Sequence, residues 1–254
     1  MKRSVHRFVF TLGLMGLCSA GLGLAPAHAQ DNAGNKAGEA ALAKVDAALN
    51  AYETLLLGYE MINREPGQPV KKLKLQVRAK GDKQLSELLA PPDMKGTKVL
   101  ALSATQMYVY LPQFKKIRRI ASHVSDVGFL GTAVSQADMN LKRYTPFYTA
   151  KLRKDGTLVL TARAGKKAPY ARIEMEVSKK LQLPTTLRYF NGKGKHVKTE
   201  TRTGYKCQGK VCNAKELEMV DHTKGDHSTT FVLKKWKTNV PMKDKLFSKR
   251  SLLR

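Results

Sequence analysis

The sequence predicts an α+β protein that is mostly β, with one antiparallel sheet of about ten short strands and helices against its concave face. Three observations lead to this prediction. Apolar and polar residues alternate over many short runs after residue 57, turn-forming Gly, Asn and Asp residues separate the runs, and one early segment has apolar residues at helical spacing. A sheet of this width tends to curl, which creates the concave face.

The first residues, 1–29, have the features of a secretory signal peptide. Basic residues begin the segment, an apolar run covers 8–24, and the small-x-small pattern Ala-His-Ala ends at residue 29. We expect cleavage near Ala29-Gln30 and export of the remaining chain. The alternative is a membrane anchor, but the apolar run is glycine-rich and short against the ~20 residues that a spanning helix needs.

The segment after the cleavage site divides into two parts. Residues 30–37 are polar and predict a flexible leader, whereas residues 38–57 predict an amphipathic helix with Leu42, Val45 and Leu49 on one face. This helix could pack on the sheet or cover a cavity. No linker or change of composition follows, so residues 38–254 are expected to form a single domain.

The charge of the chain favours an anionic partner. Lys and Arg number 46 against 20 Asp and Glu, a formal net charge of +26. The basic residues are spread over every predicted strand instead of being clustered with stacking aromatics, and export removes most nucleic acid from reach. Anionic lipid headgroups are therefore the expected polyanion, and no nucleic acid is expected as a partner.

The alternating runs contain the candidate lining of an apolar cavity. Each strand turns one apolar face inward, and the inward faces would surround either a filled core or a hollow. Ordinary core packing is the alternative for every one of these residues. The candidates are Leu73, Leu75, Val77, Leu100, Leu102, Tyr108, Tyr110, Ile173, Met175, Phe231 and Leu233.

One stretch, residues 122–141, interrupts the alternation and predicts an insertion with a short helix at 135–141. An insertion of this length in a sheet domain is usually functional or a cover. Arg118 and Arg119 just before it must point to opposite faces of a strand, so one should point inward and need an acidic partner. Asp126 and Asp138 are the candidate partners. The alternative is that the basic residues form a solvated strand face.

The cysteines predict a disulfide rather than a metal site. Removal of the signal peptide leaves Cys207 and Cys212, which can close a small hairpin loop in an oxidising compartment. A reduced pair without a role is the alternative. Two thiols cannot supply the roughly four ligands of a zinc site, and His222 and His227 are expected to be exposed at a hairpin tip. We expect no metal, no cofactor and no catalytic residues.

Several motifs together resemble a known family. They are Tyr-Val-Tyr-Leu-Pro-Gln-Phe-Lys-Lys-Ile-Arg-Arg-Ile at 108–120, Phe-Leu-Gly-Thr at 129–132, Ser-Gln-Ala-Asp-Met at 135–139, Pro-Asp-Met-Lys-Gly-Thr at 92–97, Pro-Thr-Thr-Leu-Arg-Tyr-Phe at 184–190 and the closing stretch 241–247. In this order and spacing they resemble the outer-membrane lipoprotein-sorting family, relatives of the periplasmic carrier LolA. The resemblance spans about residues 50–254. The resemblance also implies that the insertion is a lid and that Phe129 helps to anchor it, together with Asp126 and Asp138.

The resemblance implies an open, strongly curved antiparallel half-barrel whose apolar interior is capped by helices. It implies a periplasmic, non-enzymatic carrier that binds acyl chains of lipids or lipoproteins for transfer toward the outer membrane. An inner-membrane transporter and an outer-membrane acceptor would be its partners.

Two alternatives to the carrier remain. One is an accessory module that docks on an inner-membrane exporter of the RND or ABC type without cargo of its own, and the other is an exported structural protein that binds polyanions. A hollow of ~300–1,000 Å3 with apolar walls would favour the carrier, and a filled interior would favour the docking module.

Overall fold

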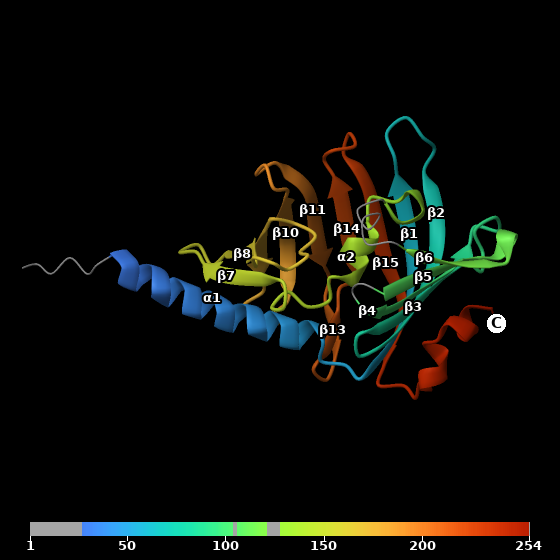
Figure 1. Ribbon diagram of the computed structural model, residues 1–254, viewed down its shortest axis with the longest axis horizontal. Coiled ribbons are helices and arrows are strands. Elements are labelled where there is room, and N and C mark those ends of the chain that lie inside the picture. The colour runs from blue at the N-terminus through green and yellow to red at the C-terminus, as the bar shows by residue number, and fades with distance from the viewer. Residues whose placement is uncertain (1–26, 104–105, 121–127, 254) are drawn as a thin grey trace, which may run out of the picture.

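The computed structural model describes residues 27–103, 106–120 and 128–253, and this part of the chain is mostly β, as predicted. Thirteen strands form one open antiparallel sheet, and two more form a separate hairpin (Figure 1). The sheet has more strands than the ten or so predicted. Strand β11 (His196–Thr203) carries charged residues and lacks the apolar alternation from which strands are predicted, whereas β14 (Glu216–Asp221) has it over only a few residues.

The sheet consists of two meanders joined at its middle. The strands of the first are β1 (Thr54–Arg64), β2 (Lys71–Lys80), β3 (Lys83–Ala90), β4 (Lys98–Ser103), β5 (Gln106–Leu111) and β6 (Lys116–Ile120). Those of the second are β7 (Tyr148–Leu152), β8 (Leu158–Ala162), β9 (Arg172–Val177), β10 (Pro184–Phe190), β11, β14 and β15 (His227–Thr238). The strand order is β6-β5-β4-β3-β2-β1-β15-β14-β11-β10-β9-β8-β7. Because β15 pairs with β1, strands from the two ends of the domain lie side by side in the middle of the sheet (Figure 1).

Helix α1 (Ala27–Leu49) begins and ends earlier than predicted. Residues 30–37, expected as a flexible leader, have helical backbone, although only two of the eight are alanine and Asp, Asn and Gly are weak helix formers. At the other end, Leu55 and Leu57 belong to β1. Apolar residues two positions apart are typical of a strand, and here they also continued the helical pattern, so the sequence alone did not separate the two elements. Signal-peptide cleavage stays a prediction, since residues 1–26 lie outside the described part. No described helix is long and apolar enough to cross a membrane.

Helix α1 packs along the edge strand β7 through very close backbone contact (Figure 1). A Cβ atom on Gly38 would lie 2.4 Å from the carbonyl oxygen of Ala150, so only glycine allows this approach. Glu39 accepts a hydrogen bond from the backbone N–H of Ala150 at 3.0 Å. Asp46, buried, accepts hydrogen bonds from the backbone N–H groups of Tyr144 and Thr145 at 2.9 Å. The helix therefore satisfies donors at a sheet edge that would otherwise be exposed.

The two faces of the sheet carry separate hydrophobic clusters. The large cluster lies on the concave face and includes Leu42 of α1, while a small one lies on the convex face of β3–β5. Two short 3-10 helices, η4 (Asp244–Leu246) and η5 (Lys249–Leu253), cover the small cluster with Phe247 and Leu252 (Figure 1). The closing stretch, which resembles a family strand in sequence, is therefore not a strand.

The insertion crosses the concave face. Its described part contains a 3-10 turn, η3 (Phe129–Gly131), and the short helix α2 (Gln136–Asn140), which lies in front of β14 and β15 in Figure 1. Ser135 begins α2 with a capping box, in which its hydroxyl accepts from the Asp138 N–H and the Asp138 carboxylate accepts from the Ser135 N–H. The predicted helix at 135–141 is confirmed in slightly shorter form.

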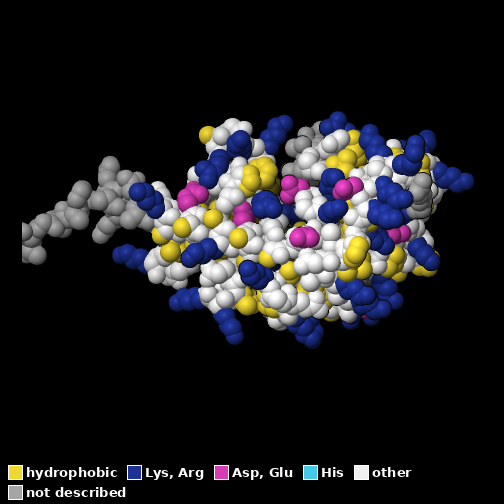
Figure 2. Space-filling model, turned by 90° about the horizontal axis from the view of Figure 1, so that it is seen from below, with side chains coloured by type: hydrophobic (Ala, Val, Ile, Leu, Met, Phe, Trp, Pro, Cys, Tyr) yellow, Lys and Arg dark blue, Asp and Glu magenta, His cyan; other side chains and the backbone are white. Residues whose placement is uncertain are grey.

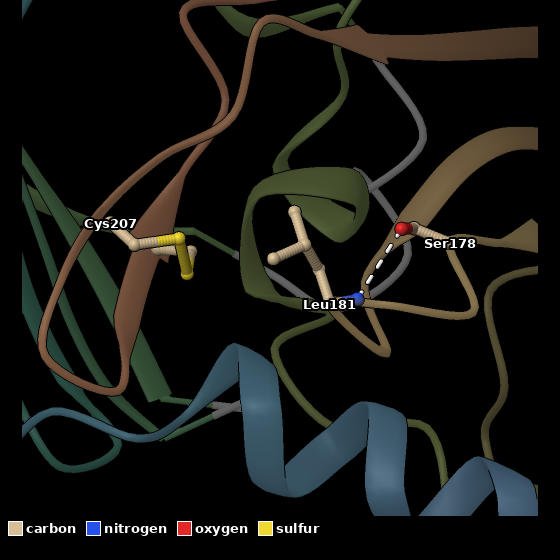
Figure 3. Close-up of a disulfide and its surroundings, with 4 residues drawn as sticks. Ser178, Leu181 and Cys207 are labelled. Atoms are coloured by element: carbon tan, nitrogen blue, oxygen red, sulfur yellow. Dashed lines mark hydrogen bonds between the residues drawn. A yellow bond between two sulfur atoms is a disulfide. The ribbon is translucent and has the colours of Figure 1, made fainter.

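The disulfide between Cys207 and Cys212 is present, as predicted. It links β12 (Lys206–Gln208) to β13 (Val211–Asn213) in the separate two-stranded hairpin. Figure 3 shows this hairpin at the left above α1, with the turn that contains Ser178 and Leu181 farther to the right. Strand β13 contacts α1, and Val211 is buried in the concave core, so the hairpin braces the helix from outside the main sheet.

Candidate functional site

A cavity of about 270 Å3 lies between the concave face of the sheet and the insertion. Strands β1, β2, β11, β14 and β15 form its floor, residues 134–142 form its cover, and the end of α1 closes one side. Its lining is mainly apolar: Leu49, Asn50, Tyr52, Leu55, Leu57, Tyr59, Leu75, Val77, Ala79, Gln84, Val134, Asp138, Met139, Leu141, Lys142, Glu200, Arg202, Leu217, Met219 and Phe231.

The apolar wall follows directly from the strand register. Leu57 of β1 lies opposite Val77 of β2, and Tyr59 lies opposite Leu75, so one alternating set from each strand faces the cavity. Phe231 of β15 meets the ring of Tyr59 edge to face at 5.7 Å between centroids. Burial raises the pKa of Tyr59 to about 12, so this side chain stays neutral.

Two charged residues of β11 also face the cavity. The Nε of Arg202 donates to Glu200 Oε1 at 2.5 Å, and the hydroxyl of Tyr189 donates to Glu200 Oε2 at 2.5 Å. Burial opposes the charge of Arg202, but the Glu200 carboxylate and the neighbouring tyrosines together outweigh it and raise the Arg202 pKa above its usual value. Arg202 therefore stays charged, and Glu200 is its buried counter-ion inside an apolar site.

The mouth of the cavity is polar and comes from three segments. Asn50 and Tyr52 follow α1, Gln84 lies on β3, and Lys142 ends the insertion. The side-chain N–H of Asn50 donates to the carbonyl of Lys142 at 2.9 Å, and the ammonium of Lys142 donates to the carbonyl of Asp82 at 3.3 Å. Burial lowers the pKa of Lys142 to about 8.

The cover is held to the sheet by an ion pair under α2. The ammonium of Lys198 on β11 donates to Asp138 Oδ2 at 2.7 Å, and both side chains are at most 9% exposed. The hydroxyl of Tyr170 donates to the other carboxylate oxygen at 2.5 Å. Burial, together with the Asp138 charge, raises the pKa of Tyr170 far above its usual value, so its hydroxyl remains a donor. These contacts fix α2 against the concave face.

A second anchor holds the start of the insertion. Asn63 of β1 donates to the carbonyl of Gly131 at 3.1 Å, and the hydroxyl of Thr229 accepts from the N–H of Ala133 at 2.9 Å. The Thr229 hydroxyl in turn donates to Asn63 Oδ1 at 2.6 Å, and His227 Nε2 lies 2.9 Å from the same oxygen. This buried polar network adds to the apolar packing of Ala133 and Val134 between the cover and the sheet.

The expected contact of Arg118 or Arg119 with Asp138 is wrong, and a contact of either arginine with Asp126 stays a prediction. Arg118 and Arg119 belong to β6 at the sheet edge, and both are exposed. The carboxylate of Asp138 is bound by Lys198 instead. Asp126 lies outside the described residues, and Phe129 is buried in the insertion, 4% exposed. Sequence adjacency suggested these arginines as partners of Asp138, but it does not reveal that β11 brings Lys198 under α2.

The predicted cavity residues separate into three groups. Leu75, Val77 and Phe231 line the cavity. Leu73, Leu233, Ile173 and Met175 face the same concave side but pack in its filled parts. Leu100, Leu102, Tyr108 and Tyr110 belong to the small cluster on the convex face, so their assignment to the cavity is wrong. Alternation shows which residues share a face, but it does not tell which face of the sheet is concave.

Sequence reasoning missed the charged residues that face inward. Lys198, Glu200 and Arg202 alternate with Thr199 and Thr201, so charged residues occupy the inward positions that normally carry apolar ones. The spacing of these charges by two is the sequence signal of the strand. It does not indicate an inward face, because charged faces are normally solvated.

The histidines near the β14–β15 turn differ from expectation. His227 is buried, 3% exposed, and belongs to the anchor network. His222 Nδ1 lies 2.6 Å from Asp226 Oδ1. The ring of His222 also packs against that of His196 on β11, and burial together with this neighbour lowers the pKa of His196. Within the described residues, no group of three or more His, Cys, Asp or Glu side chains is arranged to hold a metal ion.

Three solved structures share the fold. A DUF1329 family protein from Desulfovibrio piger is 21% identical, with a TM-score of 0.78 over 86% of this chain and 99% of its own. A domain from Vibrio parahaemolyticus, described as an outer membrane lipoprotein-sorting protein domain, is 20% identical, with a TM-score of 0.74 over 87% of this chain and 100% of its own. A LolA superfamily protein from Nitrosomonas europaea is 17% identical, with a TM-score of 0.70 over 84% of this chain and 98% of its own.

At these identities the likeness establishes the fold. No curated protein matches the sequence. A family model with the description "Uncharacterized protein" matches residues 80–254, more than half of the chain. The chain belongs to this family, and it shares its fold with the structures described as lipoprotein-sorting and LolA superfamily proteins, as its sequence motifs predict.

Proposed function

We propose that the protein is a periplasmic, non-enzymatic carrier that binds an acyl chain of a lipid or lipoprotein for transfer toward the outer membrane. The observation that carries the proposal is the covered cavity of about 270 Å3, with its apolar wall on the concave face. This volume is close to the lower end of ligand-sized pockets, ~300 Å3, and suits one chain better than several.

The energetics of a carrier match the construction of the site. Each buried methylene gains about 0.8 kcal/mol on leaving water, so a long chain needs shelter to cross an aqueous compartment. Release requires that the shelter opens. The cover meets the sheet through the Lys198–Asp138 pair and the Asn63–Thr229 network, and a few polar contacts of this kind can be exchanged for water when the cover moves.

The surface charge suits the proposed partners. Lys and Arg side chains are distributed over the whole of the face seen in Figure 2 and do not form a single stripe. Anionic lipid headgroups at a donor or acceptor membrane would meet such a surface in many orientations. An inner-membrane transporter and an outer-membrane acceptor are the proposed protein partners, and the signal-peptide features support the periplasm as the compartment.

The proposal is tested by ligand binding with a matched pair of variants. Leu217 lines the cavity from β14, whereas Val232 is a partly buried residue on the other face of the neighbouring strand β15. Leu217→Trp should fill the cavity and abolish uptake of a fluorescent fatty acid, while Val232→Trp should leave uptake unchanged. Native mass spectrometry of the purified wild type should show bound lipid. Absence of both bound lipid and uptake in the wild type would refute the carrier.

The docking module is the second candidate. It is favoured by the filled part of the concave face, where Tyr148, Leu160 and Ile173 are completely buried. Such a module would co-purify tightly with an inner-membrane exporter and bind no acyl chain. Tight co-purification together with an unoccupied cavity in the wild type would therefore move the assignment to this candidate.

A further inference from the structure

We propose that the mouth of the cavity is a binding site for an anionic headgroup, a carboxylate or a phosphate, and that Lys142 is the cation that binds it. The inference rests on the proposed function and names its cargo class: an acyl chain with an anionic group at one end. The chain would occupy the apolar wall and the anion would remain at the mouth.

The first argument is the charge balance of the cations around the cavity. Arg202 is neutralised by Glu200 at 2.5 Å, and Lys198 beside the cavity is neutralised by Asp138 at 2.7 Å. Among the described residues, Lys142 forms no ion pair. Its ammonium donates to a neutral group, the carbonyl oxygen of Asp82, at 3.3 Å. An anionic ligand can form a charge-assisted hydrogen bond with a lining cation that has no counter-ion.

The second argument is position. The side-chain amide of Asn50 donates to the carbonyl of Lys142 and also to the carbonyl of Asp46, which ties the lysine backbone to the end of α1. The lysine side chain then reaches from the cover toward the β2–β3 turn, across the polar mouth. Tyr52 and Gln84 lie at the same end of the cavity. An amphipathic ligand would place its head among these polar groups and its chain among the leucines.

The third argument is the cost of leaving Lys142 unpaired. This residue is only partly exposed, and loss of hydration disfavours its charge. The Asp82 carboxylate offers partial compensation, but it is 74% exposed and lies 3.6 Å from Nε of Arg143. Lys142, Arg143 and Asp82 together leave one positive charge at the mouth. A ligand anion would replace the hydration that Lys142 has lost.

A structural role for Lys142 is the competing explanation. The lysine could act only as a strut between the cover and the β2–β3 turn. A strut would affect every ligand equally, because it would act on the shape of the cavity. A headgroup ligand would affect anionic ligands selectively. Binding of matched ligands that differ only in the head therefore separates the two roles.

The experiment measures binding of dodecanoate, dodecyl phosphate and 1-dodecanol by titration calorimetry to the mature wild-type chain, Lys142→Gln, Lys142→Arg and the exposed control Lys193→Gln. The wild type should prefer the two anionic ligands to dodecanol by about tenfold or more, the range expected for one charge-assisted hydrogen bond. Lys142→Gln should abolish that preference and leave dodecanol binding unchanged. Lys142→Arg should retain the preference, and Lys193→Gln should match the wild type.

Each outcome has a distinct meaning. Equal binding of acid and alcohol by the wild type overturns the headgroup site and leaves the carrier proposal standing, whereas no binding of any chain defeats the carrier itself. An equal loss of all ligands in Lys142→Gln identifies a strut and overturns the inference. Inorganic phosphate should neither bind nor displace dodecanoate. Phosphate binding that is lost in Lys142→Gln would show a site for the free ion and overturn the headgroup assignment.

Discussion

The concave face has two regions, one under α1 and one under the insertion, and they are covered in different ways. Beneath α1 the space over β7–β9 is filled by side chains such as Tyr148, Leu160 and Ile173, which are completely buried. Beneath the insertion, the space over β1, β2, β14 and β15 keeps a cavity of about 270 Å3. The same sheet therefore supports a solid core and a hollow within one hydrophobic cluster.

The difference follows from the two covers. Helix α1 approaches β7 backbone to backbone at Gly38 and adds a continuous apolar face with Leu42 and Val45. The insertion is short and irregular, and it meets the sheet through polar anchors such as Lys198–Asp138. Polar anchors fix the cover at a few points and at a set distance from the sheet. The apolar side chains between these points therefore need not interdigitate with those of the sheet.

The largest expected effect concerns the anchor of the cover. Asp138→Ala leaves the ammonium of Lys198 buried and unpaired, so we expect a loss of about 4 kcal/mol in the free energy of unfolding, measured in urea. Adding Lys198→Met should restore most of that loss, because no buried charge then remains. A similar loss in the double variant would contradict the view that the anchor is one self-contained ion pair.

The next effect concerns the helix-covered region. Gly38→Ala would normally favour a helix, but here the new Cβ atom would lie 2.4 Å from the Ala150 oxygen. We expect a destabilisation of about 3 kcal/mol, since α1 must move away from β7. Gly192→Ala is the control, because nothing lies within 4 Å of its added Cβ atom. If Gly38→Ala were neutral or stabilising, the close approach of α1 would be wrong.

A matched pair of alanines compares the two regions directly. Ala79 on β2 lines the cavity and Ala150 on β7 lies in the filled region, and each is 3% exposed. Ala150→Leu should cost about 2 kcal/mol by overpacking, whereas Ala79→Leu should be close to neutral because the hollow accepts the larger side chain. Thermal melts of the two variants check this. Equal costs would mean that the two regions are packed alike.

The smallest effect concerns the mouth. Burial lowers the pKa of Lys142 to about 8, so the folded state carries a cost for its charge below that pH. Between about pH 8 and the ordinary lysine pKa of ~10.4, the unfolded chain binds more protons and stability rises with pH.

Lys142→Met should therefore raise stability by about 1 kcal/mol at neutral pH, by removing the desolvated charge, and by progressively less at higher pH. The groups facing Lys142 are Asp82 and Arg143, and exchanging either would shift this window. Urea titrations at neutral and alkaline pH measure the difference, and a gain that is independent of pH would show that the charge of Lys142 is not responsible.

Local features of the sequence predicted much of the fold. Apolar alternation located strands such as β2 and β9, and the pair Cys207 and Cys212 predicted the hairpin disulfide that the structure contains. The failures were also systematic. The pattern does not predict strands with inward charges, such as β11. It also places Leu55 and Leu57 in the helix, because their spacing fits a helix as well as a strand.

The candidate site was predicted in part. Leu75, Val77 and Phe231 line the cavity as expected, but Tyr108 and its neighbours face the other side of the sheet. Lys198, Asn63 and Thr229, which hold the cover, were not predicted. Each forms its contact with a residue at least 60 positions away in the chain, and no local pattern encodes such a partner.

Local periodicity, the number of cysteines and the order of the motifs were enough to predict the β-rich class, the disulfide pair and the resemblance to proteins of this fold. The side of the sheet that is concave, the charged side chains that turn inward and the position of the cavity emerge only when the whole sheet is assembled. Curvature and packing depend on the register of thirteen strands together, and no single segment contains that collective property.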